Sequence, residues 1–156
     1  MNIDLATLFR RDLLRLRQQI EAFSVEADLW KQAPGVTNPA GNLALHIEGN
    51  LREYIGRQLG NIPFERNRTE EFTSRGIPLS GLIALIESLQ NSIPTILKGL
   101  TPEQLEKEYP ENVLGKSLST QQFLLHLYGH LNWHLGQIDI IRRINTGQGA
   151  LKLAGL

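Results

Sequence analysis

Hydrophobic residues recur along four stretches of the chain at every third or fourth position, the spacing that places them on one face of an α-helix. The first stretch extends from Leu5 to Phe23, and Asp4 is placed to cap its N-terminus. No stretch alternates between hydrophobic and polar residues with the period of two that a half-buried strand needs. We therefore predict an all-α protein.

Two of the other three stretches begin at N-terminal signals of helices. Asn38-Pro39 offers a capping residue followed by a proline at the first helical position, and Ser119-Thr-Gln-Gln122 is a capping box. A second capping box, Thr101–Gln104, predicts a short additional helix, and Pro94 is expected to kink the third stretch. The predicted spans of the three long helices are Asn38–Leu59, Leu79–Leu97 and Ser119–Thr146.

Four amphipathic helices of about 20 residues bury their hydrophobic stripes most simply in a four-helix bundle. About 18 residues separate the second helix from the third, whereas adjacent antiparallel helices are usually joined by about 2–8. A connection of that length can cross the ~30 Å of a 20-residue helix, so the second and third helices are candidates for a parallel pair. The link before the fourth helix is also long, so connection lengths alone do not choose the topology. We expect one domain over residues 1–156.

Charge and composition exclude several classes of function. The 16 Lys and Arg residues balance the 16 Asp and Glu residues, which argues against non-specific binding to nucleic acid or anionic lipid. The absence of cysteine excludes disulfides, thiolate metal sites and a cysteine nucleophile. The charged N-terminal region does not fit a signal peptide, and the apolar runs are too short to span a membrane. We expect a cytoplasmic protein with no nucleic-acid or membrane partner.

Three of the four histidines lie within nine residues of the last predicted helix, at His126, His130 and His134. Steps of four residues keep them on one slowly drifting stripe beside hydrophobic residues, so we expect all three imidazoles to face the interior. Each buried imidazole needs partners for two nitrogens, and a metal ion satisfies several rings at once. Because His126 and His134 are ~12 Å apart along the axis, this helix supplies at most two ligands to one ion.

A third ligand must come from elsewhere in the chain. His46 is the remaining histidine and can face inward from the second helix, while Glu48, Glu53 and Asp139 are carboxylates that compete for the same place. Three protein ligands leave open positions on the ion, which suits a catalytic site better than a structural one.

The last-helix segment His126-Leu-Tyr-Gly-His-Leu-Asn-Trp-His-Leu-Gly-Gln-Ile138 resembles a signature of the DinB/YfiT-like superfamily of metal-dependent enzymes. That signature has two histidines four residues apart, followed closely by Gly-Gln-Ile, and the matching positions here are His130 and His134. The family has a further histidine in its second helix, and Asn42–Ile47, which contains His46, is similar to that segment.

The resemblance implies an up-down-down-up bundle with a long crossover between helices two and three. It also implies that His46, His130 and His134 bind a divalent ion, with zinc or nickel as the expected metals. Metal–nitrogen bonds of ~2.1 Å require the three imidazole nitrogens to lie within about 5 Å of one another. This chain has Trp133 where many relatives have another histidine, which would make the wall of the site bulkier or more apolar.

Family members resembling this chain act as thiol S-transferases or as hydrolases, so the resemblance implies a small-molecule substrate, such as a low-molecular-weight thiol. No residue stands out as a general base, which favours the thiol reaction, and no catalytic residue is assigned. The alternative is a non-catalytic stress or interaction protein whose metal is structural or fortuitous. Additional apolar residues on the first and last helices, Leu14, Leu124 and Leu135, predict a homodimer.

Other polar residues around the predicted site allow two interpretations each. His126 is either a proton shuttle or substrate contact, or a hydrogen-bonded core residue. Asp12 is either a boundary residue in water or the hydrogen-bond partner of a ligating histidine. Asn50 and Gln137 are placed to orient imidazoles or a metal-bound water.

The two remaining charged or polar segments are also open to interpretation. Residues 64–75 form either a solvated, salt-bridged loop or a cover on the metal pocket, with Arg66 or Arg68 binding an anionic group. Residues 147–156 are expected to be frayed or packed on a neighbouring molecule.

Overall fold

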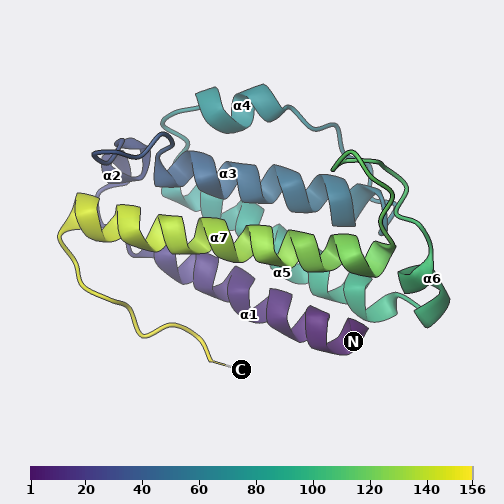
Figure 1. Ribbon diagram of the computed structural model, residues 1–156. Helices are drawn as coiled ribbons and strands as arrows, with labels where there is room; N and C mark the ends of the chain where they lie inside the picture. The colour runs from purple at the N-terminus through teal and green to yellow at the C-terminus, as the bar shows by residue number, and fades with distance from the viewer. Residues whose placement is uncertain (156) are drawn as a thin grey trace.

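Four long helices lie side by side in the computed structural model, which describes residues 1–155 (Figure 1). No β-strand occurs in this range, so the all-α prediction is confirmed. None of these helices has the length and hydropathy that crossing a membrane would require. The four are α1 (Asn2–Glu21), α3 (Ala40–Leu51), α5 (Leu79–Gly99), which contains Pro94, and α7 (Thr120–Thr146).

Shorter elements fill the connections between the long helices. The sequence predicted α6 (Pro102–Glu106) from its capping box, and both nitrogen–oxygen contacts of that box are present. It did not predict α2 (Glu26–Trp30) or α4 (Arg68–Thr73), because five or six residues are too few to show periodicity. Nor did it predict that α3 continues as a π-helix, η1 (Arg52–Arg57).

Two of the expected helix caps are wrong by one to three residues. Helix α1 begins at Asn2, so Asp4 lies in its first turn. The Asp4 carboxylate forms an ion pair with the Met1 ammonium, with 3.1 Å between nitrogen and oxygen. Pro39 has an extended ψ of 159° and therefore occupies the cap of α3, the place expected for Asn38. The capping box at Ser119 is confirmed, and Gly147 ends α7 with a φ of 70°.

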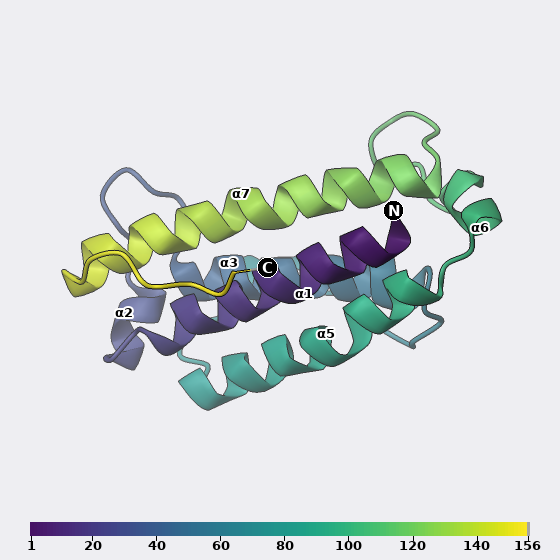
Figure 2. The same ribbon diagram turned by 90° about the horizontal axis from the view of Figure 1, so that it is seen from below.

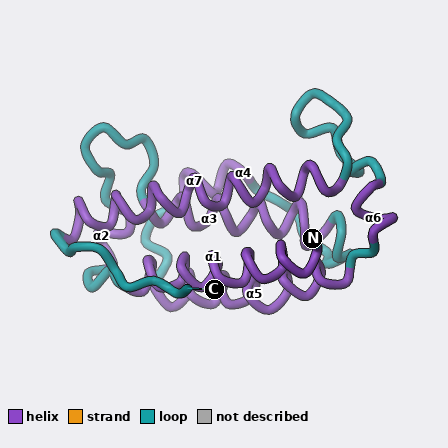
Figure 3. The backbone as a smooth tube through the Cα atoms, turned by 60° about the horizontal axis from the view of Figure 1, so that its bottom comes forward, coloured by secondary structure: helices purple, strands orange, loops and turns teal. Residues whose placement is uncertain are grey.

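Helix α3 lies at the centre of the molecule. All twelve of its residues are buried, because α4, α5, α7 and α2 pack around it. In Figure 3, α3 and α7 form one layer of the bundle, and α1 and α5 form the other. A polar side chain on α3 is therefore held inside protein rather than in water, which matters for His46.

The expected solvent exposure of the additional apolar residues is partly wrong. Leu124 and Leu135 are buried inside the bundle, and of the three residues only Leu14 is exposed. The last residues also differ from expectation, because the described tail runs back along α1 of the same chain (Figure 2). The Arg15 guanidinium donates to the Ala154 carbonyl at 2.7 Å, and the Ala154 N–H donates to Gln18 at 2.9 Å.

Candidate metal centre

Three histidines from two helices meet between α3 and α7. The Nε2 atom of His130 lies 3.1 Å from Nε2 of His46 and 3.1 Å from Nε2 of His134. One nitrogen from each ring lies within 4.8 Å of the other two, so the prediction that the three converge is confirmed. Ligand nitrogens bound to one tetrahedral ion at ~2.1 Å are about 3.4 Å apart, close to the observed spacing.

Hydrogen bonds at Nδ1 fix the orientation of two of these rings, His46 and His134. His46 Nδ1 lies 2.8 Å from a carboxylate oxygen of Glu71, which can only accept, so this nitrogen is the donor. His134 Nδ1 donates to the side-chain oxygen of Gln137 at 2.7 Å. Both rings therefore turn their Nε2 atoms towards His130.

The surroundings keep His130 neutral. Burial, reinforced by the neighbouring imidazoles of His134 and His46, lowers its pKa to about 3. Burial also lowers the pKa of His134, against the opposing effect of its Gln137 hydrogen bond. Neutral imidazole is the form that binds a metal ion, so these rings are ready to act as ligands without first losing a proton.

Glu71 is a member of the site that the sequence did not reveal. It is buried, and Arg66 donates to its two oxygens at 2.6 and 3.0 Å. Burial alone would raise the pKa of this carboxyl, but the hydrogen bonds from His46 and Arg66 outweigh burial and hold it below its usual value. A charged carboxylate therefore stands behind His46.

Much of the charged segment 64–75 is exposed, but part of it packs against the histidine group. Within it, α4 docks on α3, where the Asn42 amide donates to the carbonyls of Glu71 and Ser74 at 3.0 Å each. The Phe72 ring lies 4.9 Å from the His46 ring. Arg66 is engaged by Glu71, so this arginine is a structural partner of the site and not a free anion-binding group.

Several residues singled out from the sequence lie elsewhere. His126 is exposed and stacks on Phe123 at 5.8 Å, so the expectation that it faces the interior is wrong. The drift of the stripe by about 40° over one four-residue step takes it out of the core. Asp12 matches neither interpretation, because it is fully buried and binds Arg11, Arg15 and Tyr128 instead of a histidine.

None of the competing carboxylates belongs to the histidine group. Each is paired with an arginine on its own helix or its continuation: Glu48 with Arg52, Glu53 with Arg57, and Asp139 with Arg142. Of the two amides expected to orient imidazoles, Gln137 does so. The buried Asn50 side-chain oxygen has no hydrogen-bond partner among the described residues.

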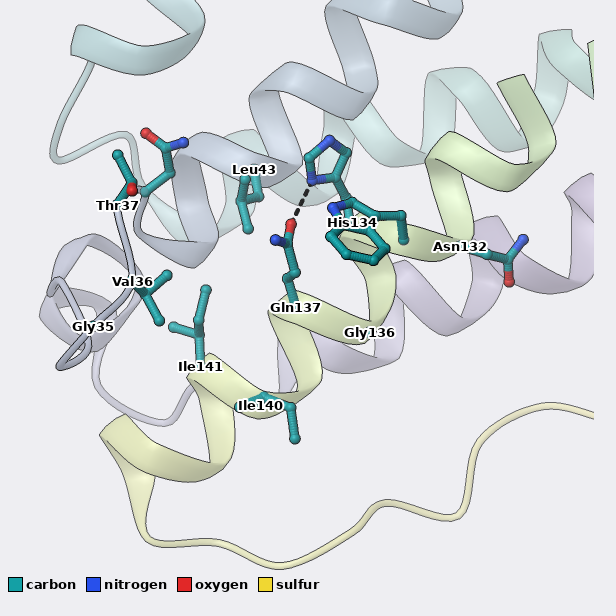
Figure 4. A pocket seen from close by; sticks show the side chains of 12 residues that line it. Gly35, Val36, Thr37, Leu43, Asn132, His134, Gly136, Gln137, Ile140 and Ile141 are labelled. Carbon is teal, nitrogen blue, oxygen red and sulfur yellow. Dashed lines mark hydrogen bonds between the residues drawn. The ribbon is translucent and has the colours of Figure 1, made fainter. Parts of the chain in front are cut away.

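A cavity of about 660 Å³ adjoins the histidine group (Figure 4). It lies between the second half of α7 and the segment leading into α3, and His134 and Gln137 form part of its wall. Val36, Leu43 and Ile141 contribute hydrophobic surface. Trp133 also lines it, and 69% of this residue is exposed.

The donor set fits a divalent metal ion. Three Nε2 atoms converge, and two of the rings are oriented by hydrogen bonds at Nδ1. The Arg66 guanidinium lies 3.5 Å from His46 Nδ1, at the nitrogen that does not face His130. Imidazole nitrogen is a ligand type that suits zinc and nickel. His46, His130 and His134 would hold such an ion.

Comparison with known proteins supports the fold. No protein-family model matches the chain, and no curated protein matches it in sequence. A crystal structure of a DinB-like protein from Bacillus subtilis, YjoA, matches with a TM-score of 0.69 over 97% of this chain and 96% of that chain. The two sequences are 19% identical. The chain thus has the fold of a DinB-like protein, in agreement with the resemblance of its last-helix motif.

Proposed function

We propose that this protein binds a divalent metal ion through His46, His130 and His134 and uses it in an enzymatic reaction. The observation that carries the proposal is the convergence of the three Nε2 atoms, two of them 3.1 Å from the third. A structural site normally has four protein ligands, whereas three leave a position for a substrate. Zinc and nickel are the metals that we propose.

Of the two reactions, transfer of a thiol has the better support. When bound, the ion would supply positive charge that lowers the pKa of a coordinated thiol or water. Hydrolysis also needs a base for water, and the nearest carboxylate, Glu71, is occupied by His46 and Arg66. We therefore propose a thiol S-transferase that acts on a small molecule.

The test begins with metal content. Protein purified without an affinity tag should carry about one zinc or nickel per chain, and a chelator should remove both the metal and the consumption of a low-molecular-weight thiol in the presence of an electrophile. Hydrolysis of ester substrates without thiol consumption would favour the hydrolase. A bound metal that raises only the melting temperature would favour the non-catalytic alternative.

Two features of the whole molecule belong to the same proposal. The up-down-down-up order is supported by the course of the ribbon, in which α1 and α7 run in one direction and α3 and α5 in the other (Figure 1). A homodimer is supported by Ile3 and Leu14, which are exposed and eleven residues apart on α1, so that they lie on one face.

A further inference from the structure

The cavity beside His134 has an unusual lining for a surface pocket. Its volume of about 660 Å³ falls in the range of about 300–1,000 Å³ that is typical of small-molecule sites. Among the residues that line it there is no lysine, arginine, aspartate or glutamate, and His134 is the one titratable group. The rest of its wall is made of hydrophobic side chains, backbone and neutral polar groups.

The polar groups of the cavity are few and lie at identifiable places. Gln137 lies beside His134, and Asn132 and Thr37 lie at the border of the cavity (Figure 4). Asn38 is the remaining side-chain amide in the lining. Val36, Ile140 and other hydrophobic side chains cover the space between them. An ionised ligand that binds here would lose part of its hydration without gaining a partner of opposite charge, whereas an apolar ligand would gain by leaving water.

From this lining we infer that the cavity binds the uncharged, apolar body of the substrate, with one neutral polar group directed to the Gln137 end. This inference rests on the proposed function, since it concerns the molecule that reacts at the histidine cluster. It assigns the substrate to neutral compounds with an aromatic or aliphatic body. Gln137 connects the two sites because it lines the cavity and accepts the hydrogen bond from His134 Nδ1.

The experiment uses two probes with the same body and different charge, 4-phenylbutan-1-ol and 4-phenylbutyrate. Each is titrated into the full-length, metal-free protein while the backbone amide signals are followed by NMR. We expect the alcohol to shift signals of residues 35–38 and 132–141 and to bind at least tenfold more tightly than the carboxylate. Equal binding of the two, or shifts confined to other parts of the chain, would overturn the inference.

Two glycines of α7 provide matched variants. Gly136 lines the cavity, Gly129 does not, and a Cβ at either position would meet no atom within 4 Å. Gly136→Leu should place a side chain in the cavity and weaken binding of the alcohol at least tenfold, whereas Gly129→Leu should leave it unchanged. Equal effects of the two substitutions would contradict the assignment of the cavity.

Zinc titration of the same samples separates this inference from the proposed function. Zinc binding that persists while the alcohol fails to bind overturns the inference alone. Alcohol binding without zinc binding supports the inference about the cavity and contradicts the proposed metal-dependent reaction. If amide signals of residues 132–141 change on dilution without a probe, a second copy of the chain occupies the cavity, and the inference is overturned.

Discussion

At the scale of single residues, hydrogen bonds at Nδ1 decide which nitrogen each histidine offers to an ion. Glu71 does this for His46 through a contact of 2.8 Å, and Gln137 does it for His134. A carboxylate behind a ligating imidazole also makes the imidazole a stronger base, because its charge stabilises the proton on Nδ1. Glu71 is thus a positioning residue for the proposed site.

Glu71→Gln should weaken zinc binding about 10–100-fold, the usual effect of losing such a partner. The substitution keeps the size of the side chain and removes its charge, and calorimetric titration with zinc measures the result. Glu70→Gln is the matched control, because Glu70 is the exposed neighbour on α4 and should leave the affinity unchanged. Equal affinities of Glu71→Gln and the natural protein would show that Glu71 does not act on the metal.

The difference between the predicted and observed site residues has a physical explanation. His130 and His134 are recognisable because one helix fixes their spacing, and His46 was the remaining histidine. Glu71 is 25 residues from His46 and contacts it only after α4 has docked on α3. No local pattern in the sequence encodes such a contact, since it depends on the course of the crossover.

At the scale of elements, Gly49 allows α4 to approach α3. A Cβ at this position would collide with a carboxylate oxygen of Glu71. That oxygen cannot move freely, because Arg66 binds it and His46 binds its partner oxygen. A larger residue at position 49 must therefore displace α4 or the Glu71 side chain.

Gly49→Ala should lower the free energy of unfolding by about 1–3 kcal/mol, the usual cost of overpacking, and should also weaken zinc binding. Gly129→Ala, in an open position of α7, should instead stabilise the protein by about 0.5–1 kcal/mol. Urea denaturation of both variants measures the two effects. A Gly49→Ala protein with unchanged stability and zinc affinity would contradict the close docking of α4.

A buried carboxylate joins α1 to α7. Asp12 binds Arg11 at 2.7 Å and accepts a hydrogen bond from Tyr128 at 2.8 Å. Burial alone would raise the pKa of Asp12, but the hydrogen bonds from Arg11 and Tyr128 hold it below its ordinary value of 3.8. Its stabilising contribution is therefore fully present above pH 3.8 and is lost as the pH falls through the lowered pKa.

Asp12→Asn should reduce the free energy of unfolding by about 3 kcal/mol at pH 7, as expected when one partner of a buried ion pair is removed. The difference from the natural protein should shrink below pH 3.8, where the carboxyl becomes protonated. Glu21→Gln removes an exposed ion pair with Arg17 and should cost less than about 1 kcal/mol. A difference that stays constant from pH 7 to pH 2 would exclude this role of Asp12.

Most of the fold at this scale follows from the sequence, because long amphipathic helices and capping boxes leave local signals. The short helices α2 and α4 and the π-helix η1 leave none, since they depend on what the chain packs against. The caps of α1 and α3 show the same limit. A favourable capping residue, Asp4 or Asn38, does not begin the helix where neighbouring residues allow it to start elsewhere.

At the scale of the whole molecule, the assembly is the main open prediction. Light scattering at micromolar concentration should give twice the 17.6 kDa of one chain. Leu14→Lys should shift the mass to that of one chain, because it places a charge on the exposed apolar face of α1. If the natural protein has the mass of one chain at this concentration, the prediction of a homodimer is wrong.

The central claim, that the three histidines bind one metal ion, is tested most directly by zinc titration of the natural protein, His130→Ala and His126→Ala. His130 contacts both other rings, whereas His126 is exposed and lies outside the cluster. The natural protein and His126→Ala should bind one zinc ion per chain with equal affinity. His130→Ala should bind it at least 10–100-fold more weakly and retain its helical circular dichroism. Unchanged zinc affinity in His130→Ala, or a loss in His126→Ala alone, would contradict the assignment.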